Sequence, residues 1–204
     1  MERPPSTSLT NRLIHEALLL LDGIVSSMPG RTGQLLRHRY YTLRLKRLGR
    51  MGSGSIDSGM RFDSPENISI GDDFAALRHC FIGAGDGGLV EIGSNVTLNS
   101  NVSIDAGERG VIRIGDDSGL AHNCVLRASS HNYDDPTRPW KSQGHKPGSI
   151  IVEEDVWIAA NCILLPGTHI ERGAIVASGS VVGGRVKAYS IVAGHPARVI
   201  GKRG

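Results

Sequence analysis

Aliphatic residues recur every six positions along most of this chain, and this spacing limits the possible folds more than any other feature. A period of six fits neither an α-helix, which repeats about every 3.6 residues, nor a single strand, which repeats every two. The longest uninterrupted set comprises Val152, Ile158, Leu164, Ile170, Val176 and Val182. Shorter sets precede it, and they are Ile70, Ala76 and Ile82; Ile92, Leu98 and Ile104; and Ile114, Leu120 and Leu126.

Two further positions keep a fixed distance from each aliphatic residue. The side chain four positions later is usually small, as at Val96, Val102, Ser118, Cys124, Val156, Cys162, Thr168, Ala174, Ser180 and Val186. The position just before it is often a residue that tolerates positive φ, as tight corners require. These corner residues are Asn95, Asn101, Asp117, Asn123, Asp155, Asn161, Gly167, Gly173 and Gly179. The pattern predicts a triangular hexapeptide β-helix, in which each coil of three short strands covers the apolar face of the coil before it.

Breaks in the repeat all fall at one corner of the predicted coil. The aliphatic residues Ile70, Ile92 and Ile114 lie 22 positions apart, four more than three hexapeptides need. Both additions follow the third hexapeptide, and the longest break, between Leu126 and Val152, follows it too. We therefore expect a loop at about 127–150 to project from that corner. Long loops on a rigid repeat scaffold are where function tends to lie.

A different pattern occupies the N-terminal quarter of the chain. Apolar spacing predicts a helix over about 10–28, ended by Pro29 and Gly30, and a second over about 32–48. No acidic residue occurs between Asp22 and Asp57, whereas basic residues are frequent there. Two compatible interpretations remain open. The helices cap the open end of the β-helix, or the basic residues of 31–50 contact an anionic membrane surface.

These patterns divide the chain into three parts. We expect an N-terminal helical segment at 1–52, an all-β, left-handed parallel β-helix domain at 53–187, and a C-terminal tail at 188–204. A content of 27 glycines and 4% aromatic residues suits a narrow prism with tight corners.

Composition excludes several classes of function. A net charge of +3 is too small to indicate a nucleic-acid partner. The three cysteines occupy small interior positions, and their odd number, with no secretory segment, predicts a reducing, cytoplasmic location. A disulfide between Cys124 and Cys162 is conceivable only if these two fall on neighbouring coils. We expect no metal requirement, since no two of the eight histidines have the five-residue spacing of the zinc-type carbonic anhydrases built on related prisms.

Several segments resemble one enzyme family. They are the hexapeptide ladder itself, the loop sequence at 130–136 (SHNYDDP), the segment 154–161 (EDVWIAAN), the segment 164–167 (LLPG) and the tail at 192–200 (VAGHPARVI). Over about 56–202 the chain is similar to hexapeptide-repeat O-acetyltransferases of the maltose and galactoside branch, with their relatives from capsule, exopolysaccharide and O-antigen clusters. The resemblance implies a homotrimer that binds acetyl-coenzyme A in a groove between adjacent prisms and acetylates a saccharide hydroxyl.

The resemblance also implies a role for His131, which matches the general base of that family. In those enzymes the histidine takes a proton from the acceptor hydroxyl as its oxygen attacks the thioester, without an acyl-enzyme intermediate. An imidazole suits this task because it changes protonation state near neutral pH. Such a base contributes about 10²–10⁴-fold in rate.

Two further residues are implied on the acceptor side. Asn99 matches an acceptor-binding asparagine of the family. The alternative interpretation is that Asn99 is simply a solvent-facing strand residue. Asp105 either holds acceptor hydroxyls, orients the imidazole of His131, or simply forms a turn. The turn at 106–110 differs in length from that of the family, so the family's carboxylate position is not reproduced there.

Coenzyme A contacts follow from the resemblance alone, and they are Ala160, Ser178, Gly183, Gly184, Arg198 and Trp157. The first two match positions whose backbone meets the pantetheine arm, and Arg198 matches a basic residue near the phosphates. The family often has Thr-Lys where this chain has its two glycines. Trp157 either lines the cofactor groove or braces the trimer.

Other activities remain as alternatives. An N-acetyltransferase for a nucleotide-linked amino sugar is the main one, because an amine acceptor must also lose a proton and His131 would serve it equally. Serine acetyltransferase is disfavoured by the absence of an acidic helical domain. A scaffold without catalysis is disfavoured by the matches at His131, Trp157 and Arg198.

Overall fold

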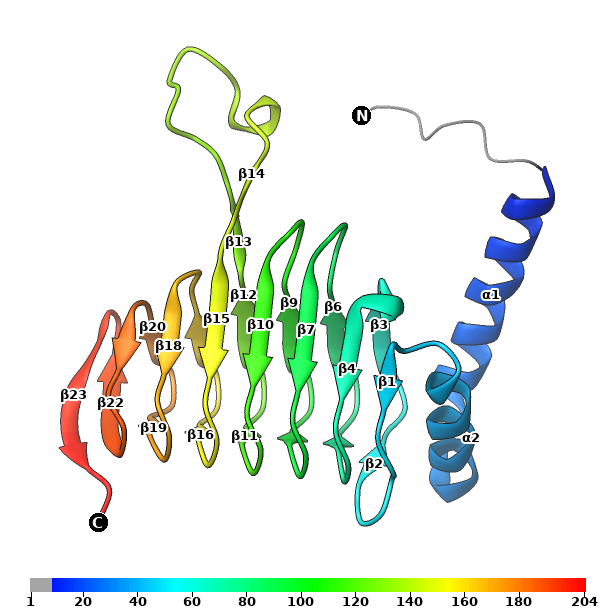
Figure 1. The fold of residues 1–204 in the computed structure, drawn as a ribbon, viewed down its shortest axis with the longest axis horizontal. Helices are drawn as coiled ribbons and strands as arrows, with labels where there is room; N and C mark the ends of the chain where they lie inside the picture. Colours follow the sequence, from blue (N-terminus) through cyan, green and yellow to red (C-terminus); the bar gives the residue numbers. More distant parts are fainter. Residues whose placement is uncertain (1–8) are drawn as a thin grey trace.

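The computed structural model describes residues 9–204, which form a β-helix with two α-helices at its N-terminal end (Figure 1). The first eight residues of the predicted helical segment 1–52 lie outside the described residues. In Figure 1 the chain descends on the near wall and returns on the far one while it advances from right to left, which is a left-handed winding. The predicted all-β, left-handed parallel β-helix is confirmed.

Three sheets form the walls of the described coils, and their strands are parallel except for the last. Sheet A contains β1 (Arg47–Leu48), β4 (Ile68–Ile70), β7 (Leu89–Ile92), β10 (Val111–Ile114), β15 (Ser149–Val152), β18 (Thr168–Ile170) and β21 (Arg185–Val186). Sheet B contains β2 (Ser55–Ile56), β5 (Ala75–Ala76), β8 (Thr97–Leu98), β11 (Gly119–Leu120), β16 (Trp157–Ile158), β19 (Ile175–Val176), β22 (Ser190–Gly194) and β23 (Ala197–Lys202). Sheet C contains β3 (Arg61–Asp63), β6 (Phe81–Gly83), β9 (Ser103–Asp105), β12 (Val125–Arg127), β17 (Ile163–Leu164) and β20 (Val181–Val182).

The core is a stack of aliphatic side chains along the prism axis. Each predicted six-residue ladder position is buried, and neighbouring coils place equivalent rungs in register, as with Ile82, Ile104 and Leu126. The small companion positions are buried too and complete each layer. Removing one such aliphatic side chain from water contributes about 1.5–3 kcal/mol. The stack therefore explains why the six-residue period is so regular.

Positive φ occurs at all nine predicted corner positions. At one corner the side chains also bond along the prism axis. The Asn101 amide donates to the Asn123 Oδ1 at 3.2 Å, and the Asn123 amide donates to the Asn161 Oδ1 at 3.1 Å. Asparagine therefore serves twice at this corner, since it accepts left-handed backbone and links adjacent coils.

The N-terminal helices, α1 (Leu9–Ser27) and α2 (Gly30–Thr42), pack at the first coil (Figure 1). The predicted second helix over 32–48 is too long. It ends at Thr42, because residues 47–48 pair with β4 as the edge strand of sheet A. The sheets thus begin before the predicted boundary at 53, and β22 and β23 continue them beyond the boundary at 187. Neither described helix is long and apolar enough to cross a membrane.

A buried arginine joins both helices to the prism. The Arg37 guanidinium, on α2, donates to the Val25 and Met28 carbonyls at 3.1 and 2.5 Å and to the Ile56 carbonyl at 2.8 Å. The first two carbonyls are near the C-terminal end of α1, where helix carbonyls lack partners of their own. Burial lowers the pKa of Arg37, so its hydrogen bonds offset a real cost of desolvation.

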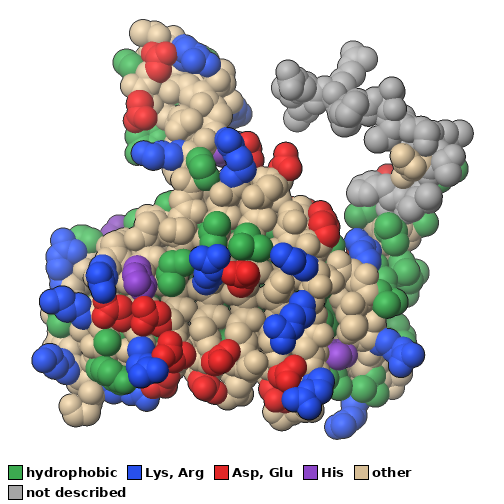
Figure 2. Space-filling view, viewed as in Figure 1, with side chains coloured by type: hydrophobic (Ala, Val, Ile, Leu, Met, Phe, Trp, Pro, Cys, Tyr) green, Lys and Arg blue, Asp and Glu red, His purple; other side chains and the backbone are tan. Residues whose placement is uncertain are grey.

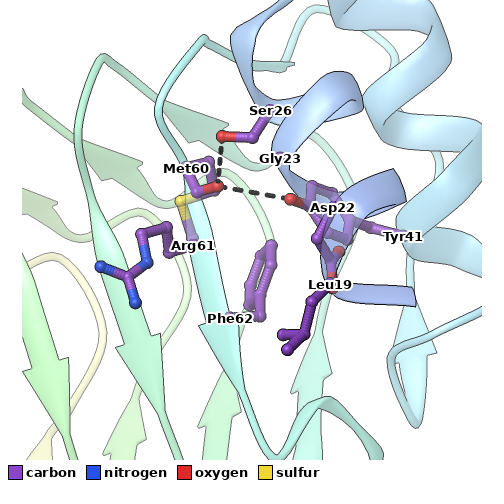
Figure 3. Close-up of a pocket in the computed structure, with 8 residues that line it drawn as sticks. All are labelled: Leu19, Asp22, Gly23, Ser26, Tyr41, Met60, Arg61 and Phe62. Atoms are coloured by element: carbon purple, nitrogen blue, oxygen red, sulfur yellow. Dashed lines mark hydrogen bonds between the residues drawn. The ribbon is translucent and has the colours of Figure 1, made fainter. Parts of the chain in front are cut away.

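A cavity of about 280 Å³ lies between α1 and the first coil. Figure 3 shows Ser26 and Tyr41 approaching it from the two helices, and both hydroxyls donate to the Met60 carbonyl at 3.1 and 3.3 Å. The cavity is at the helical end of the prism, away from the projecting loop (Figure 1). We interpret it as the joint between helices and prism.

Candidate active site

The segment predicted to project does so as a β-hairpin. Strands β13 (Ser129–His131) and β14 (His145–Pro147) pair antiparallel and stand away from the prism (Figure 1). The hairpin leaves sheet C after β12 and returns to sheet A at β15, which is the predicted corner.

Hydrogen bonds within the loop hold its outer part in one shape. The Asn132 backbone N–H donates to the Gly144 carbonyl at 3.0 Å, and its amide donates to the Gln143 carbonyl at 3.0 Å. The Gln143 amide donates in turn to the Asp135 carbonyl at 2.9 Å. The histidine of the SHNYDDP sequence is therefore carried on an arm that is internally bonded.

His131 is surrounded by rings rather than by carboxylates. Its imidazole centroid lies 4.3 Å from that of His145, its cross-strand partner, and 4.6 Å from the Trp140 ring, which meets it edge to face. The Glu108 Oε2, from the turn one coil earlier, lies 3.3 Å from the His145 Nδ1. A chain of contacts thus runs from Glu108 through His145 to His131. The ring of His131 remains exposed.

Asp105 does not contact His131. Its carboxylate pairs with the Arg127 guanidinium, its register neighbour on β12, and accepts a hydrogen bond from the Gly107 N–H at 2.8 Å. The structure therefore does not show Asp105 orienting the His131 imidazole. The predicted role of Asp105 in binding the acceptor stays a prediction.

Two residues predicted to contact coenzyme A, Ala160 and Ser178, lie along the opposite edge of sheet C. The register of sheet B places Ser100, His122, Ala160 and Ser178 in one column on successive coils. The Gly179 N–H donates to the Ala160 carbonyl at 2.9 Å, whereas Ser178 has no hydrogen-bond partner among the described residues. Free backbone groups beside small side chains suit an extended amide-bearing arm.

Sheet C separates this column from the hairpin, and its outer surface is partly apolar. Register places Phe81, Ser103, Val125, Ile163 and Val181 in one outward row. Val125 and Ile163 are exposed. One face of the prism thus combines an apolar centre, the His131 hairpin on one edge and the Ala160–Ser178 column on the other.

The remaining predicted cofactor residues lie further along the prism. Gly183 and Gly184 follow β20 at the hairpin's own corner, two coils beyond it, and a Cβ on Gly184 would meet nothing within 4 Å. Arg198 is exposed on β23 and has no acidic partner among the described residues. Its guanidinium donates to the Ala197 carbonyl at 2.9 Å. An exposed guanidinium without an acidic partner fits phosphate groups.

Trp157 and Asn99 occupy other surroundings. Trp157 is exposed on β16 of sheet B, in a hollow also lined by Asp155 and Arg203. Asn99 follows β8 at the corner between sheets B and C. No measured contact joins either residue to His131, and their assigned roles stay predictions.

Within residues 9–204, no cluster of three or more histidine, cysteine, aspartate or glutamate side chains is arranged to bind a metal ion.

Comparison with known proteins agrees with the repeat. Residues 149–184 match the family model described as bacterial transferase hexapeptide (six repeats). This segment of the chain therefore carries the repeat of that family model. A probable acetyltransferase of Mycobacterium tuberculosis is 37% identical over 84 residues, which make up 41% of this chain and 28% of that protein. The match thus spans less than a third of that relative's length.

Solved structures share the architecture. An N-acyltransferase from Bacillus cereus, in complex with dTDP and 3-hydroxybutyryl-CoA, has a TM-score of 0.71 at 23% identity and covers 82% of this chain and 88% of its own. A maltose O-acetyltransferase from Clostridium difficile has a TM-score of 0.60 at 21% identity, over 93% of this chain and 86% of its own. At these identities the likeness establishes the fold.

Sequence reasoning missed the residues around His131. His145, Trp140 and Glu108 carry no family motif, and the first two are separated from His131 by the loop. His131 and His145 come together because β13 and β14 pair as the two arms of the hairpin. The register of those arms is set by the loop's own hydrogen bonds, which no periodicity reveals.

Proposed function

We propose that this protein is an acyltransferase that moves an acetyl group from acetyl-coenzyme A to a hydroxyl of a saccharide. The observation that carries the proposal is the position of His131, exposed at the edge of sheet C on an internally bonded arm. Across that sheet lie Ala160 and Ser178, two small residues, and the backbone groups of Ser178 have no partner among the described residues. Support also comes from relatives and neighbours that are acyltransferases.

In the proposed reaction one ring nitrogen of His131 accepts the proton of the acceptor hydroxyl. The hydroxyl oxygen then forms a bond to the thioester carbonyl carbon, and the carbon–sulfur bond breaks. The departing thiolate takes the proton back from the imidazolium, so that coenzyme A leaves as a thiol. The rate gain expected from this base is about 10²–10⁴-fold, and the fixed position of the hairpin contributes to orientation.

Acetyl-coenzyme A fits the sheet C face in three respects. Small residues at Ala160 and Ser178 leave room for the pantetheine arm, and unbonded backbone groups at Ser178 are available to its amides. Arg198 is exposed and has no acidic partner among the described residues, so it is available to the phosphates. Gly183 and Gly184 leave the hairpin corner open for the chain of the cofactor.

A homotrimer completes the proposed site. The apolar row on sheet C, with Val125 and Ile163 exposed, offers a contact surface to a neighbouring prism. That prism would cover the row and would form the second wall of a cofactor groove. Trp157, on sheet B, would then either line that groove or brace the contact between prisms.

The saccharide acceptor is proposed as a unit of a surface polysaccharide, held near Asn99 and Asp105. A nucleotide-linked amino sugar is the second candidate. It is favoured by the Bacillus cereus neighbour, an N-acyltransferase solved with dTDP, whose TM-score exceeds that of the maltose O-acetyltransferase. His131 would accept the proton from an amine in the same way.

The test is a thiol-release assay with acetyl-coenzyme A and three acceptors in parallel: a free sugar, a lipid-linked oligosaccharide and a nucleotide-linked amino sugar. Mass spectrometry of the product then locates the acetyl group. An ester on either of the first two supports the proposal. An amide on the third acceptor supports the second candidate instead. If no acceptor causes release of the coenzyme A thiol, both candidate functions are contradicted.

A further inference from the structure

The outer side of α1 is an apolar stripe that nothing in the described chain covers. Leu13, Leu20 and Ile24 are 63%, 69% and 61% exposed. At 3.6 residues per turn they fall, with Ala17, within about 60° of one another on the helix surface. The opposite side packs inward through Val25, which is buried. The stripe is thus a continuous face and not a scatter of single residues.

The second helix adds more exposed apolar side chains at the same end of the molecule. Leu35 and Leu36 are exposed on α2, and Leu43, just beyond it, is 83% exposed. Leu35 and Leu43 line a shallow hollow together with Arg39. Leucine and arginine side chains therefore lie together on this surface.

Charge on this end is mostly basic, although Glu16 is exposed on α1. Arg31, Arg39 and Lys46 are exposed, and none of these three has an acidic partner among the described residues. Asp22 is neutralised by Arg44 at 3.2 Å. Figure 2 shows hydrophobic side chains along α1 and basic side chains beside them over α2, at the helical end of the prism.

From these observations we propose that α1 and α2 dock this protein on an anionic lipid bilayer. The leucines of both helices insert at the level of the acyl chains, and the unpaired arginines and lysines meet lipid phosphates. A second copy of the chain is a poorer occupant, because two such faces would bring like charges together. The inference is independent of the acyltransferase chemistry, since neither helix carries a proposed site residue.

The geometry of the prism agrees with docking by this end. The hairpin that bears His131 projects sideways from the coils (Figure 1). It leaves the prism near the middle of its length, well away from α1. A bilayer against the helices would leave the hairpin open to a membrane-associated acceptor. Arg37 fixes both helices to the first coil, so the docking face is held in place relative to the site.

The test is flotation with vesicles of phosphatidylcholine alone and of phosphatidylcholine mixed with phosphatidylglycerol. The unaltered protein is expected to float with the mixed vesicles and to be released by high salt. Leu20→Ser with Ile24→Ser is expected to weaken binding about tenfold or more. Arg31→Glu with Arg39→Glu is expected to remove the preference for phosphatidylglycerol.

Matched controls lie on β23 at the other end of the prism, where Ile200 is 65% exposed and Lys202 is exposed. Ile200→Ser and Lys202→Glu are expected to float like the unaltered protein. Absence of flotation by the unaltered protein, or equal flotation of the α1 variant, would overturn the proposal. A smaller mass of the α1 variant in sedimentation velocity would assign the face to a second copy instead. Turnover of a soluble acceptor is measured alongside and is expected to be unchanged in the α1 variant, so this result is separable from that of the acyltransferase assay.

Discussion

The imidazole of His131 lies against that of His145, with ring centroids 4.3 Å apart across the base of a hairpin. His145 is tied in turn to Glu108 on the preceding coil, at 3.3 Å from its Nδ1. Glu108, on the prism, is therefore connected to the exposed ring of His131 through one side chain, that of His145. We expect this contact to decide the orientation of the proposed base.

Replacing His145 tests that relationship. His145→Ala is expected to lower kcat about tenfold, because misorientation of a base reduces productive geometry, while KM for acetyl-coenzyme A stays unchanged. Glu108→Ala is expected to act in the same direction. Glu108→Gln keeps an oxygen beside the His145 Nδ1, so it is expected to retain most of the activity. Steady-state kinetics of the three variants would contradict the account if the glutamine and alanine variants were equally impaired.

The Arg37 clamp predicts a large effect on stability. Arg37→Met is expected to lower the free energy of unfolding by about 3 kcal/mol, since three carbonyls on α1 and the first coil lose their donor. Arg39→Met, two residues later on an exposed surface, is the control and is expected to change it by less than about 0.5 kcal/mol. Urea unfolding followed by circular dichroism measures both, and equal losses would show that the clamp does not stabilise the fold.

The cysteines are expected to be inert in the folded protein. All three are free and buried. Burial raises the pKa of the Cys80 thiol, and the hydrogen bond with Cys162, followed by burial, raises the pKa of the Cys124 thiol. The same hydrogen bond lowers the pKa of Cys162, but that side chain is fully buried and out of reach of a reagent. Because the thiolate is the reactive form, the raised pKa values keep Cys80 and Cys124 as unreactive thiols at neutral pH. Iodoacetamide should label no cysteine in the native protein and three in urea, as read by mass spectrometry. Rapid native labelling of Cys80 or Cys124 would place that side chain outside the core.

The repeat was readable from the sequence because burial imposes it at every coil. Residues such as Ile104 and Asn101 fill interior and corner positions that recur with the same geometry, so one period predicts both. The position of the hairpin followed from where the repeat breaks. The end of the second helix could not be predicted in this way. Arg47 and Leu48 continue the helical pattern in the sequence, yet in the structure they pair with β4.

Contacts at the candidate site were beyond sequence reasoning for a different reason. The partner of Asp105 depends on a long side chain, Arg127, reaching across from the neighbouring coil. The contact between His131 and His145 depends on a hairpin register fixed by bonds such as that from Asn132 to Gly144. Such choices are local to one loop and leave no periodic trace.

The central claim is that His131 acts as a base on an acceptor beside acetyl-coenzyme A. The most direct measurement is turnover of His131→Ala together with its coenzyme A affinity by calorimetry. We predict unchanged folding and affinity with a loss of turnover of about 10²-fold or more. Undiminished turnover in a folded variant would contradict the claim.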